Sequence, residues 1–351
     1  MRVAFVAMTT AYHDETPATR RTRRIARHLA ASGHEVTVLC SRWWEGTIPE
    51  FEHEDVLYRS ITAESDARKF ASKLPFALKN CSPDVVHAVN TPPSAVVAAK
   101  TTARLLRVPV VVDWWADGAG SKKNYRRAAT GADAVVTPSE TVRTRVREYG
   151  AAEDDVRVIP ESIDLSLVRE ADVDDRADVV YARDLDEGAN VESFLLALAE
   201  LRDRDWQAAV IGDGPERERA ETTARDLRID DRVDFLGDLA DEERVPILKG
   251  AHVFAQTAER EAFPTNLLWA LACGCVGIVE YQAGSSAHEL VEGKARGKLV
   301  TSPQELADEI VASGGMERQT VNEDYASFDH SEVLQRYLDC YTEVVDDYGF
   351  F

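Results

Sequence analysis

The sequence predicts an α/β protein built from two tandem doubly wound, Rossmann-like domains, and three observations lead there. Short Val-rich runs alternate with amphipathic stretches of helical length, which is typical of parallel sheets covered by helices on both faces. The alternation stops in one polar segment and then starts again. The length of 351 residues exceeds one ordinary core and suits two domains of about 150–170 residues each.

The first domain is expected over residues 1–165. It opens with a buried strand at 2–8, RVAFVAM, followed by a helix over 18–32 that Gly33 ends. Further strands are expected, with helices between them, at 35–40, 84–89, 108–114, 133–138 and 156–160.

The second domain is expected over residues 179–330, after a polar and acidic linker at 166–178. Its strands are expected at 179–183, 206–212, 233–237, 252–257 and 276–281, and residues 331–346 form a last amphipathic helix. Two such domains in tandem predict a ligand site in a cleft between the carboxyl ends of their strands.

The charge of the chain is unevenly divided. The chain has 41 Lys and Arg against 62 Asp and Glu, a net charge of −21, which argues against a generic nucleic-acid binder. Residues 1–150 nevertheless carry 22 basic against 16 acidic side chains. Many acids beside few Lys favour a salt-adapted, halophilic protein over a merely acidic product of a GC-rich genome.

Cysteine content and hydropathy indicate a cytoplasmic location. The five cysteines form no Cys-x-x-Cys pair, and Cys273 and Cys275 lack a nearby His or Cys to complete a zinc site. We therefore expect reduced thiols, no metal and no cofactor. No apolar run reaches 18 residues and the N-terminus is unlike a secretory signal, although attachment to the inner face of the membrane stays open.

One ordered set of segments covers nearly the whole chain: HLAASGHEVTVLC at 28–40, ADAVVTPSETVRTRV at 132–146, VRVIPESID at 156–164, VIGDGPERE at 210–218 and AEREAFPTNLLWALACGCVGIVEY at 258–281. In this order they resemble the retaining glycosyltransferases of family 4, which have the GT-B fold. The resemblance implies transfer of a sugar from a nucleotide-sugar donor, with retention and without a metal. It also implies a donor site on the second domain, an acceptor site on the first, and a helix at 331–351 that packs back on the first domain.

The resemblance assigns several donor-site residues. Arg183 matches an Arg that holds phosphate, and Glu261 matches the first Glu of a Glu-x7-Glu motif that contacts the donor sugar and stabilises charge. The other donor-binding candidates are Asn190, Gly212, Gly214, Phe263, Pro264, Thr265 and Asn266. Physically, an Arg fork and the N–H groups of a helix start both suit a diphosphate. The alternatives are an ordinary buried helix start and a solvated Glu.

Two positions depart from the family pattern. Trp269 stands where the second Glu would hold the ribose, and Ala189 stands where the family has a Lys. Asn190 is then expected to cap the following helix. These departures leave two interpretations: an active hexosyltransferase with an altered donor site, or a degenerate glycosyltransferase-like binding or scaffold protein. A nucleotide-sugar epimerase fits the signature segment less well.

The basic first domain suggests an anionic or glycan acceptor. Asp113 ends a strand expected to face the cleft, so it is a candidate catalytic base. The candidates for binding the acceptor or an anion are Arg20, Arg24, His87, Asp117, Lys122 and Lys123. The alternatives are arginines paired with neighbouring acids and a packed core His. The expected partners are a nucleotide-sugar donor, a lipid-linked or cell-surface glycan acceptor and an anionic membrane surface, but no nucleic acid.

Overall fold

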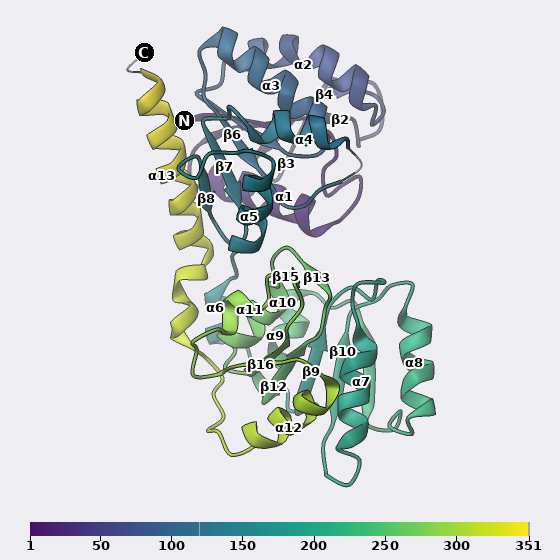
Figure 1. The fold of residues 1–351 in the computed structure, drawn as a ribbon. Coiled ribbons are helices and arrows are strands. Elements are labelled where there is room, and N and C mark those ends of the chain that lie inside the picture. Colours follow the sequence, from purple (N-terminus) through teal and green to yellow (C-terminus); the bar gives the residue numbers. More distant parts are fainter. Residues whose placement is uncertain (119, 350–351) are drawn as a thin grey trace. The chain divides into compact units, whose positions relative to one another are not determined.

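The computed structural model describes residues 1–118 and 120–349 and divides into two compact units (Figure 1). Unit 1 comprises Met1–Pro160 and the C-terminal segment from Val333, and unit 2 comprises Glu161–Glu332. The segment 166–178, expected as a linker, lies within unit 2 and contributes to helix α6 (Leu165–Glu170). Asp164 caps this helix through its side chain, and the buried Leu165 and Val168 anchor it.

The described part of unit 1 contains a largely parallel sheet in the order β3-β4-β2-β1-β5-β6-β7-β8. Its strands are β1 (Arg2–Val6), β2 (Glu35–Ser41), β3 (Glu50–His53), β4 (Val56–Thr62), β5 (Val85–Val89), β6 (Val110–Asp113), β7 (Ala134–Thr137) and β8 (Val156–Val158). The β3–β4 hairpin is antiparallel and was not predicted. Its turn residues Glu54 and Asp55 both adopt the left-handed conformation that suits a two-residue hairpin loop.

The C-terminal helix α13 (His330–Gly349) completes the core of unit 1. From Val333 on, its apolar side chains pack with those of the sheet and of α1, and the buried cluster includes Tyr337, Tyr341, Phe5 and Leu29. The other helices of unit 1 are α1 (Pro17–Ala31), α2 (Ala67–Cys81), α3 (Pro93–Leu106), α4 (Lys122–Ala129) and α5 (Glu140–Glu148).

Unit 2 has a parallel sheet in the order β11-β10-β9-β12-β14-β16. The strands are β9 (Val179–Ala182), β10 (Ala208–Ile211), β11 (Val233–Gly237), β12 (Val253–Gln256), β14 (Val276–Glu280) and β16 (Gly297–Val300), and β13 (Arg260–Glu261) pairs separately with β15 (Gly284–Ser285). The helices are α6, α7 (Val191–Glu200), α8 (Arg217–Asp226), α9 (Asp241–Gly250), α10 (Thr265–Ala272), α11 (His288–Val291), α12 (Pro303–Ser313) and the 3₁₀ helix η1 (Glu323–Phe328). The prediction of two Rossmann-like α/β domains is confirmed.

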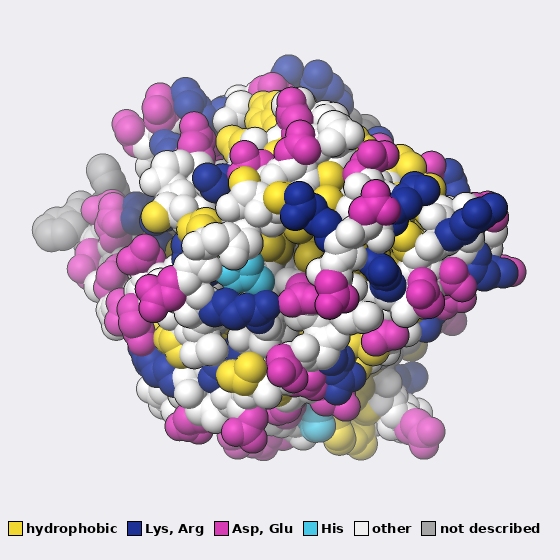
Figure 2. Space-filling model, turned by 90° about the horizontal axis from the view of Figure 1, so that it is seen from below, with side chains coloured by type: hydrophobic (Ala, Val, Ile, Leu, Met, Phe, Trp, Pro, Cys, Tyr) yellow, Lys and Arg dark blue, Asp and Glu magenta, His cyan; other side chains and the backbone are white. Residues whose placement is uncertain are grey.

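The surface carries many charges of both signs. On the face drawn in Figure 2, Asp and Glu side chains lie interspersed with Lys and Arg. Several acids of unit 2 are paired with an Arg nearby: Arg217 bridges Asp213 and Glu221 on or beside its own helix. Such pairing allows a very acidic unit to fold while keeping its charge near water.

Candidate functional site

The candidate site lies in unit 2, where strands β9 and β10 of the parallel sheet end. Arg183 follows β9 directly, and its guanidinium meets residues of β13. Its Nη1 donates to Glu261 Oε2 at 2.9 Å and to the carbonyl of Arg260 at 2.8 Å. Its Nη2 donates to both carboxylate oxygens of Asp186, at 3.1 and 3.2 Å. The carboxyl ends of parallel strands are the usual ligand-binding edge of such sheets.

Glu261 is a carboxyl group with an unusual environment. Its side chain is only 17% exposed, and it is held by Arg183. Burial raises the pKa of Glu261 to about 7, because the charge of Arg183 opposes this effect incompletely and Asp186 and Asp184 add to it. Near neutral pH this carboxyl therefore gains or loses a proton readily, which is a property of functional sites.

Gly212 and Gly214 position the backbone of the Arg183 loop. Both have positive φ, of 129° and 150°. A Cβ on Gly212 would lie 2.0 Å from the carbonyl oxygen of Arg183, and one on Gly214 would lie 2.5 Å from that of Leu185. Because glycine has no Cβ, the loop that contains Gly212 and Gly214 can contact the backbone of Arg183 and Leu185, and this contact holds Arg183 in position. Their predicted direct contact with a donor stays a prediction.

The start of α10 lies against the same strand end. Asn266 donates its side-chain N–H to the carbonyl of Ala182 at 2.9 Å, so this amide holds the helix beside Arg183. The helix begins at Thr265, and Pro264 takes the N-cap position. Phe263 is buried. Among the described residues, the first-turn N–H groups of Asn266 and Leu267 have no hydrogen-bond acceptor and can serve an anion.

The positions that depart from the family pattern are buried. Ala189 is fully buried, and its carbonyl accepts a hydrogen bond from Tyr181. Trp269 is 2% exposed within α10 and belongs to the core. Asn190 takes the expected N-cap position of α7, but its side chain makes no capping hydrogen bond: its amide instead donates to the carbonyl of Thr257 at 3.0 Å. Its left-handed backbone conformation explains why the cap geometry is lost.

Arg260 is a candidate that sequence reasoning missed. Its side chain is exposed and forms no ion pair with any described residue. A Cβ placed on Gly188, next to Ala189, would lie 4.0 Å from Arg260 Cβ and 3.6 Å from Arg183 Nη2. The Cβ of Arg260 therefore lies next to the loop of Gly188 and Ala189, in which the Lys of the family pattern is missing. The sequence signal was an Arg flanked by Glu259 and Glu261, read only as part of an acidic loop.

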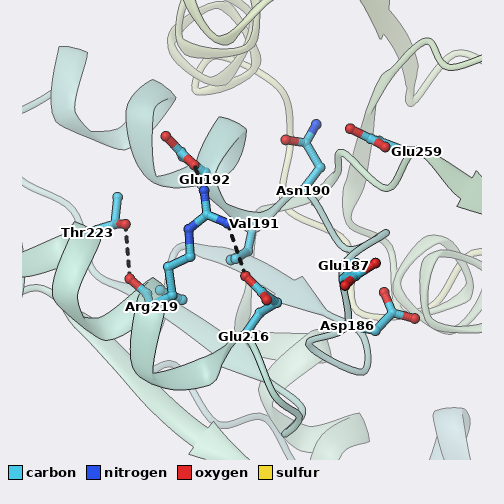
Figure 3. Close-up of a pocket in the computed structure, with 10 residues that line it drawn as sticks. Asp186, Glu187, Asn190, Val191, Glu192, Glu216, Arg219, Thr223 and Glu259 are labelled. Atoms are coloured by element: carbon cyan, nitrogen blue, oxygen red, sulfur yellow. Dashed lines mark hydrogen bonds and ion pairs between the residues drawn. The ribbon is translucent and has the colours of Figure 1, made fainter.

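A hollow of about 180 Å³ adjoins the site and is mostly acidic (Figure 3). Its lining comprises Asp186, Glu187, Asn190, Val191, Glu192, Glu216, Arg219, Ala220, Thr223 and Glu259. Arg219 bonds Glu216 and Glu192, and Asn190 and Glu259 lie on the side away from Thr223. Five carboxylates repel a diphosphate, so this hollow does not suit one.

In unit 1, two predicted residues prove to be buried. Asp113 is 4% exposed and accepts from Arg21 Nε at 3.1 and 3.2 Å, and His87 Nε2 lies 3.5 Å from it. Burial disfavours its charged form, but Arg21 and His87 outweigh this and hold the pKa of Asp113 below its ordinary value. The expectation that Asp113 faces an acceptor is therefore not met. His87 is also fully buried, with Nδ1 2.7 Å from the hydroxyl of Tyr341.

The other unit 1 candidates remain at the surface. Asp117 is exposed and accepts from the Trp114 indole at 3.2 Å and the Tyr149 hydroxyl at 2.7 Å. Lys122 and Lys123 are exposed on α4. On α1, Arg20 is exposed and Arg24 is half-buried. Their neighbours Arg23 and Arg27 pair with Glu54, so part of this basic cluster is neutralised as the alternative interpretation held.

Two absences concern only the described residues. Among residues 1–118 and 120–349, no group of three His, Cys, Asp or Glu side chains is placed to hold a metal ion. Nor does this part of the chain contain a helix long and apolar enough to cross a membrane.

Comparison with known proteins gives matches in both units. Residues 18–167 match the family model "Glycosyltransferase Family 4" and residues 166–312 match "Glycosyl transferases group 1". The alpha-monoglucosyldiacylglycerol synthase of Streptococcus pneumoniae is 26% identical over 54% of this chain and 47% of its own length. The lipopolysaccharide 1,6-galactosyltransferase of Salmonella typhimurium is 26% identical over 64% and 63%. The matches thus span about half to two thirds of these relatives.

A solved structure shares the fold over nearly the whole chain. The crystal structure of Anabaena HepE in complex with UDP has a TM-score of 0.79 and 19% identity, and the match covers 98% of this chain and 100% of that one. At this identity the likeness concerns the fold. Because the two family models adjoin and together span residues 18–312, both units of the chain are glycosyltransferase family domains.

Proposed function

We propose that the protein transfers a hexose from a nucleotide-sugar donor to a lipid-linked or cell-surface glycan acceptor, with retention at the anomeric carbon. The observation that carries the proposal is the Arg183–Glu261 pair at the ligand-binding edge of unit 2, next to the start of α10. The UDP complex of the Anabaena protein supports the donor class. The names of the two relatives, a glycolipid synthase and a lipopolysaccharide transferase, support the acceptor class.

The donor diphosphate would be held by groups already close together. Arg183 exchanges a carboxylate partner for phosphate oxygens, and the N–H groups of Asn266 and Leu267 add neutral donors. Arg260 contributes a second positive charge. As the bond between the anomeric carbon and the diphosphate breaks, these groups stabilise the negative charge on the leaving phosphate. The acceptor hydroxyl then bonds through its oxygen to the same face of the sugar, which is retention, and its proton passes to the departing phosphate oxygen.

Glu261 is assigned to the sugar. A half-buried carboxyl beside the diphosphate can accept hydrogen bonds from sugar hydroxyls and offset positive charge at the anomeric carbon. We expect no metal to take part, and transfer measured with and without EDTA tests this expectation.

The direct test uses purified protein and a panel of nucleotide sugars. Transfer or slow donor hydrolysis should be detectable and should be lost in Glu261→Ala. Glu259→Ala is the matched control, because Glu259 carries the same charge two residues away but lies in the acidic hollow. If no nucleotide sugar raises the melting temperature at millimolar concentration and high salt, the enzyme proposal should be abandoned.

A second candidate function rests on the buried Ala189 and Trp269. Without the family's Lys and ribose-binding Glu, the fold would serve as a binding or scaffold subunit. That function predicts a melting shift with a nucleotide sugar but neither transfer nor hydrolysis by the wild type. Arg183, Glu261 and Arg260 favour the enzyme, because they keep two cations and a carboxyl at one edge of the sheet.

We also propose a salt-adapted, cytoplasmic protein. The net charge of −21 supports salt adaptation, since screening relieves repulsion between carboxylates. A melting temperature that rises with KCl between dilute buffer and molar salt is the expected result. A melting temperature that falls over this range would contradict it.

A further inference from the structure

Two helices of unit 1 expose large apolar side chains. Helices α2 and α3 pack side by side on the sheet (Figure 1). Phe76 of α2 is 75% exposed and Leu105 of α3 is 82% exposed, the highest values among the large apolar residues described. Both helices already bury a separate apolar side, which includes Phe70, Leu74 and Val96. Phe76 and Leu105 are therefore not needed for packing within the unit.

The same helices carry positive charge without any acid. Residues 67–83 and 85–112 contain no Asp or Glu, although the chain has 62. The exposed basic side chains on this surface are Arg68, Lys69, Lys73, Lys79, Arg104 and Arg107. Lys69 lies 3.5 Å from the capping Asp66, and the other five have no acidic partner among the described residues. In the rest of the chain, by contrast, Arg side chains repeatedly pair with carboxylates.

We propose that this surface, called here the α2–α3 surface, docks the protein on an anionic lipid bilayer. Lys and Arg side chains are attracted to anionic headgroups, while Phe76 and Leu105 enter the boundary of the acyl chains. A nucleic acid would use the charges but would leave both apolar side chains in water. The combination therefore favours a bilayer, and an anionic one because the two helices themselves contain no Asp or Glu.

This inference deepens the proposed function by giving the acceptor a lipid environment, but its test needs no sugar nucleotide. Docking on a bilayer brings the enzyme and a lipid-linked acceptor into the same thin layer of solvent. A protein that docks yet transfers no sugar refutes only the proposed function. A protein that transfers sugar to a soluble acceptor but never docks refutes only the present inference.

The experiment is co-sedimentation of the full chain with vesicles, at the lowest KCl concentration at which circular dichroism shows the native fold. Vesicles of phosphatidylcholine with phosphatidylglycerol should bind the protein, and pure phosphatidylcholine should bind far less. The double variant Phe76→Ser, Leu105→Ser should weaken binding about tenfold. Leu299→Ser, an exposed apolar residue of unit 2, is the control and should change nothing.

A charge variant separates the two contributions. Lys73→Glu with Lys79→Glu should abolish the preference for phosphatidylglycerol, since the surface would then repel anionic headgroups. Equal binding to neutral and anionic vesicles by the wild type overturns the proposal. A second result would also overturn it: duplex DNA displaces the protein from the vesicles, and the Phe76→Ser, Leu105→Ser variant binds the vesicles as well as the wild type does. That result would identify a site for polyanions instead.

Discussion

Each unit places an Arg–carboxylate pair at a strand end, yet the two pairs have opposite properties. In unit 1, Arg21 and Asp113 are 2% and 4% exposed, and Arg21 also donates to the carbonyls of Ile159 and Pro160. In unit 2, Arg183 and Glu261 are 13% and 17% exposed. The pKa of Asp113 is lowered, whereas that of Glu261 is raised to about 7.

The difference shows that the surroundings of an Arg–carboxylate pair determine whether the pair is structural or able to bind a ligand. Asp113 is stabilised in its charged form by Arg21 and by His87, and α13 covers the group with Tyr337 and Tyr341. Glu261 shares its Arg with Asp186 and stands near further negative charge. The first pair is thus fixed in one state, and the second can change partners or protons when an anion arrives.

The largest effect is expected from breaking the fixed pair. Asp113→Ala leaves the guanidinium of Arg21 buried without its counter-charge, which should lower the free energy of unfolding by about 3–5 kcal/mol. Urea denaturation followed by circular dichroism measures this. The double variant Arg21→Met, Asp113→Leu removes both charges and should recover much of the loss. A loss below about 1 kcal/mol in the single variant would contradict a fixed structural pair.

The next largest effect is expected from disturbing the backbone contact that positions Arg183 in the Arg183–Glu261 pair. Gly212→Ala places a Cβ 2.0 Å from the carbonyl oxygen of Arg183 at a φ of 129°, so the Arg183 loop must move. We expect a loss of about 1–3 kcal/mol in stability together with loss of measurable donor binding. Gly293→Ala is the control, because its φ is also positive but no atom lies within 4 Å. Equal effects of both substitutions would mean that backbone strain alone is responsible.

The contrast between the units also explains how far the sequence could be interpreted. Alternating Val-rich strands predicted both sheets, because buried parallel strands leave a clear hydrophobic signal. The β3–β4 hairpin was missed because β3 (EFEH) is short and polar, and without it the apolar residues of β4 (VLYRSIT) were overlooked. Arg183 and Glu261 could be named as donor-site candidates because each lies in a short segment of sequence that matches a family motif. Asp113 was misplaced because its partner Arg21 lies 92 residues away, a contact that only the folded chain reveals.

A smaller effect is expected at Arg260. Arg260→Gln removes the second cation proposed for the diphosphate and should weaken binding of UDP-glucose about tenfold without changing the melting temperature of the free protein. Arg260→Lys should keep most of the affinity. Arg219→Gln is the matched control, since Arg219 is already paired with Glu192 and Glu216. Isothermal titration calorimetry gives both affinities, and equal losses in the two Gln variants would point to net charge instead.

The smallest effect is expected in the pH dependence of donor binding, which tests most directly whether Glu261 can change its protonation state while Asp113 cannot. Glu261 in the free protein has a pKa of about 7, and the charged groups around it are Arg183, Asp184 and Asp186. The ionised carboxylate of Glu261 repels a diphosphate and keeps the guanidinium of Arg183 as its partner, whereas the protonated carboxyl does neither. Binding of UDP-glucose should therefore weaken several-fold as the pH rises from 6 to 8, because the diphosphate diester itself does not titrate there.

Glu261→Gln isolates this carboxyl. Its amide cannot ionise, so the affinity for UDP-glucose should be nearly constant over the same pH range and close to the acidic limit of the wild type. The same linkage applies to stability: a carboxyl whose pKa is raised on folding destabilises the native state above pH 7, and the penalty is relieved as the pH falls toward the unfolded value near 4.5. An affinity that rises with pH, or an equal slope in Glu261→Gln, would show that Glu261 is as fixed as Asp113.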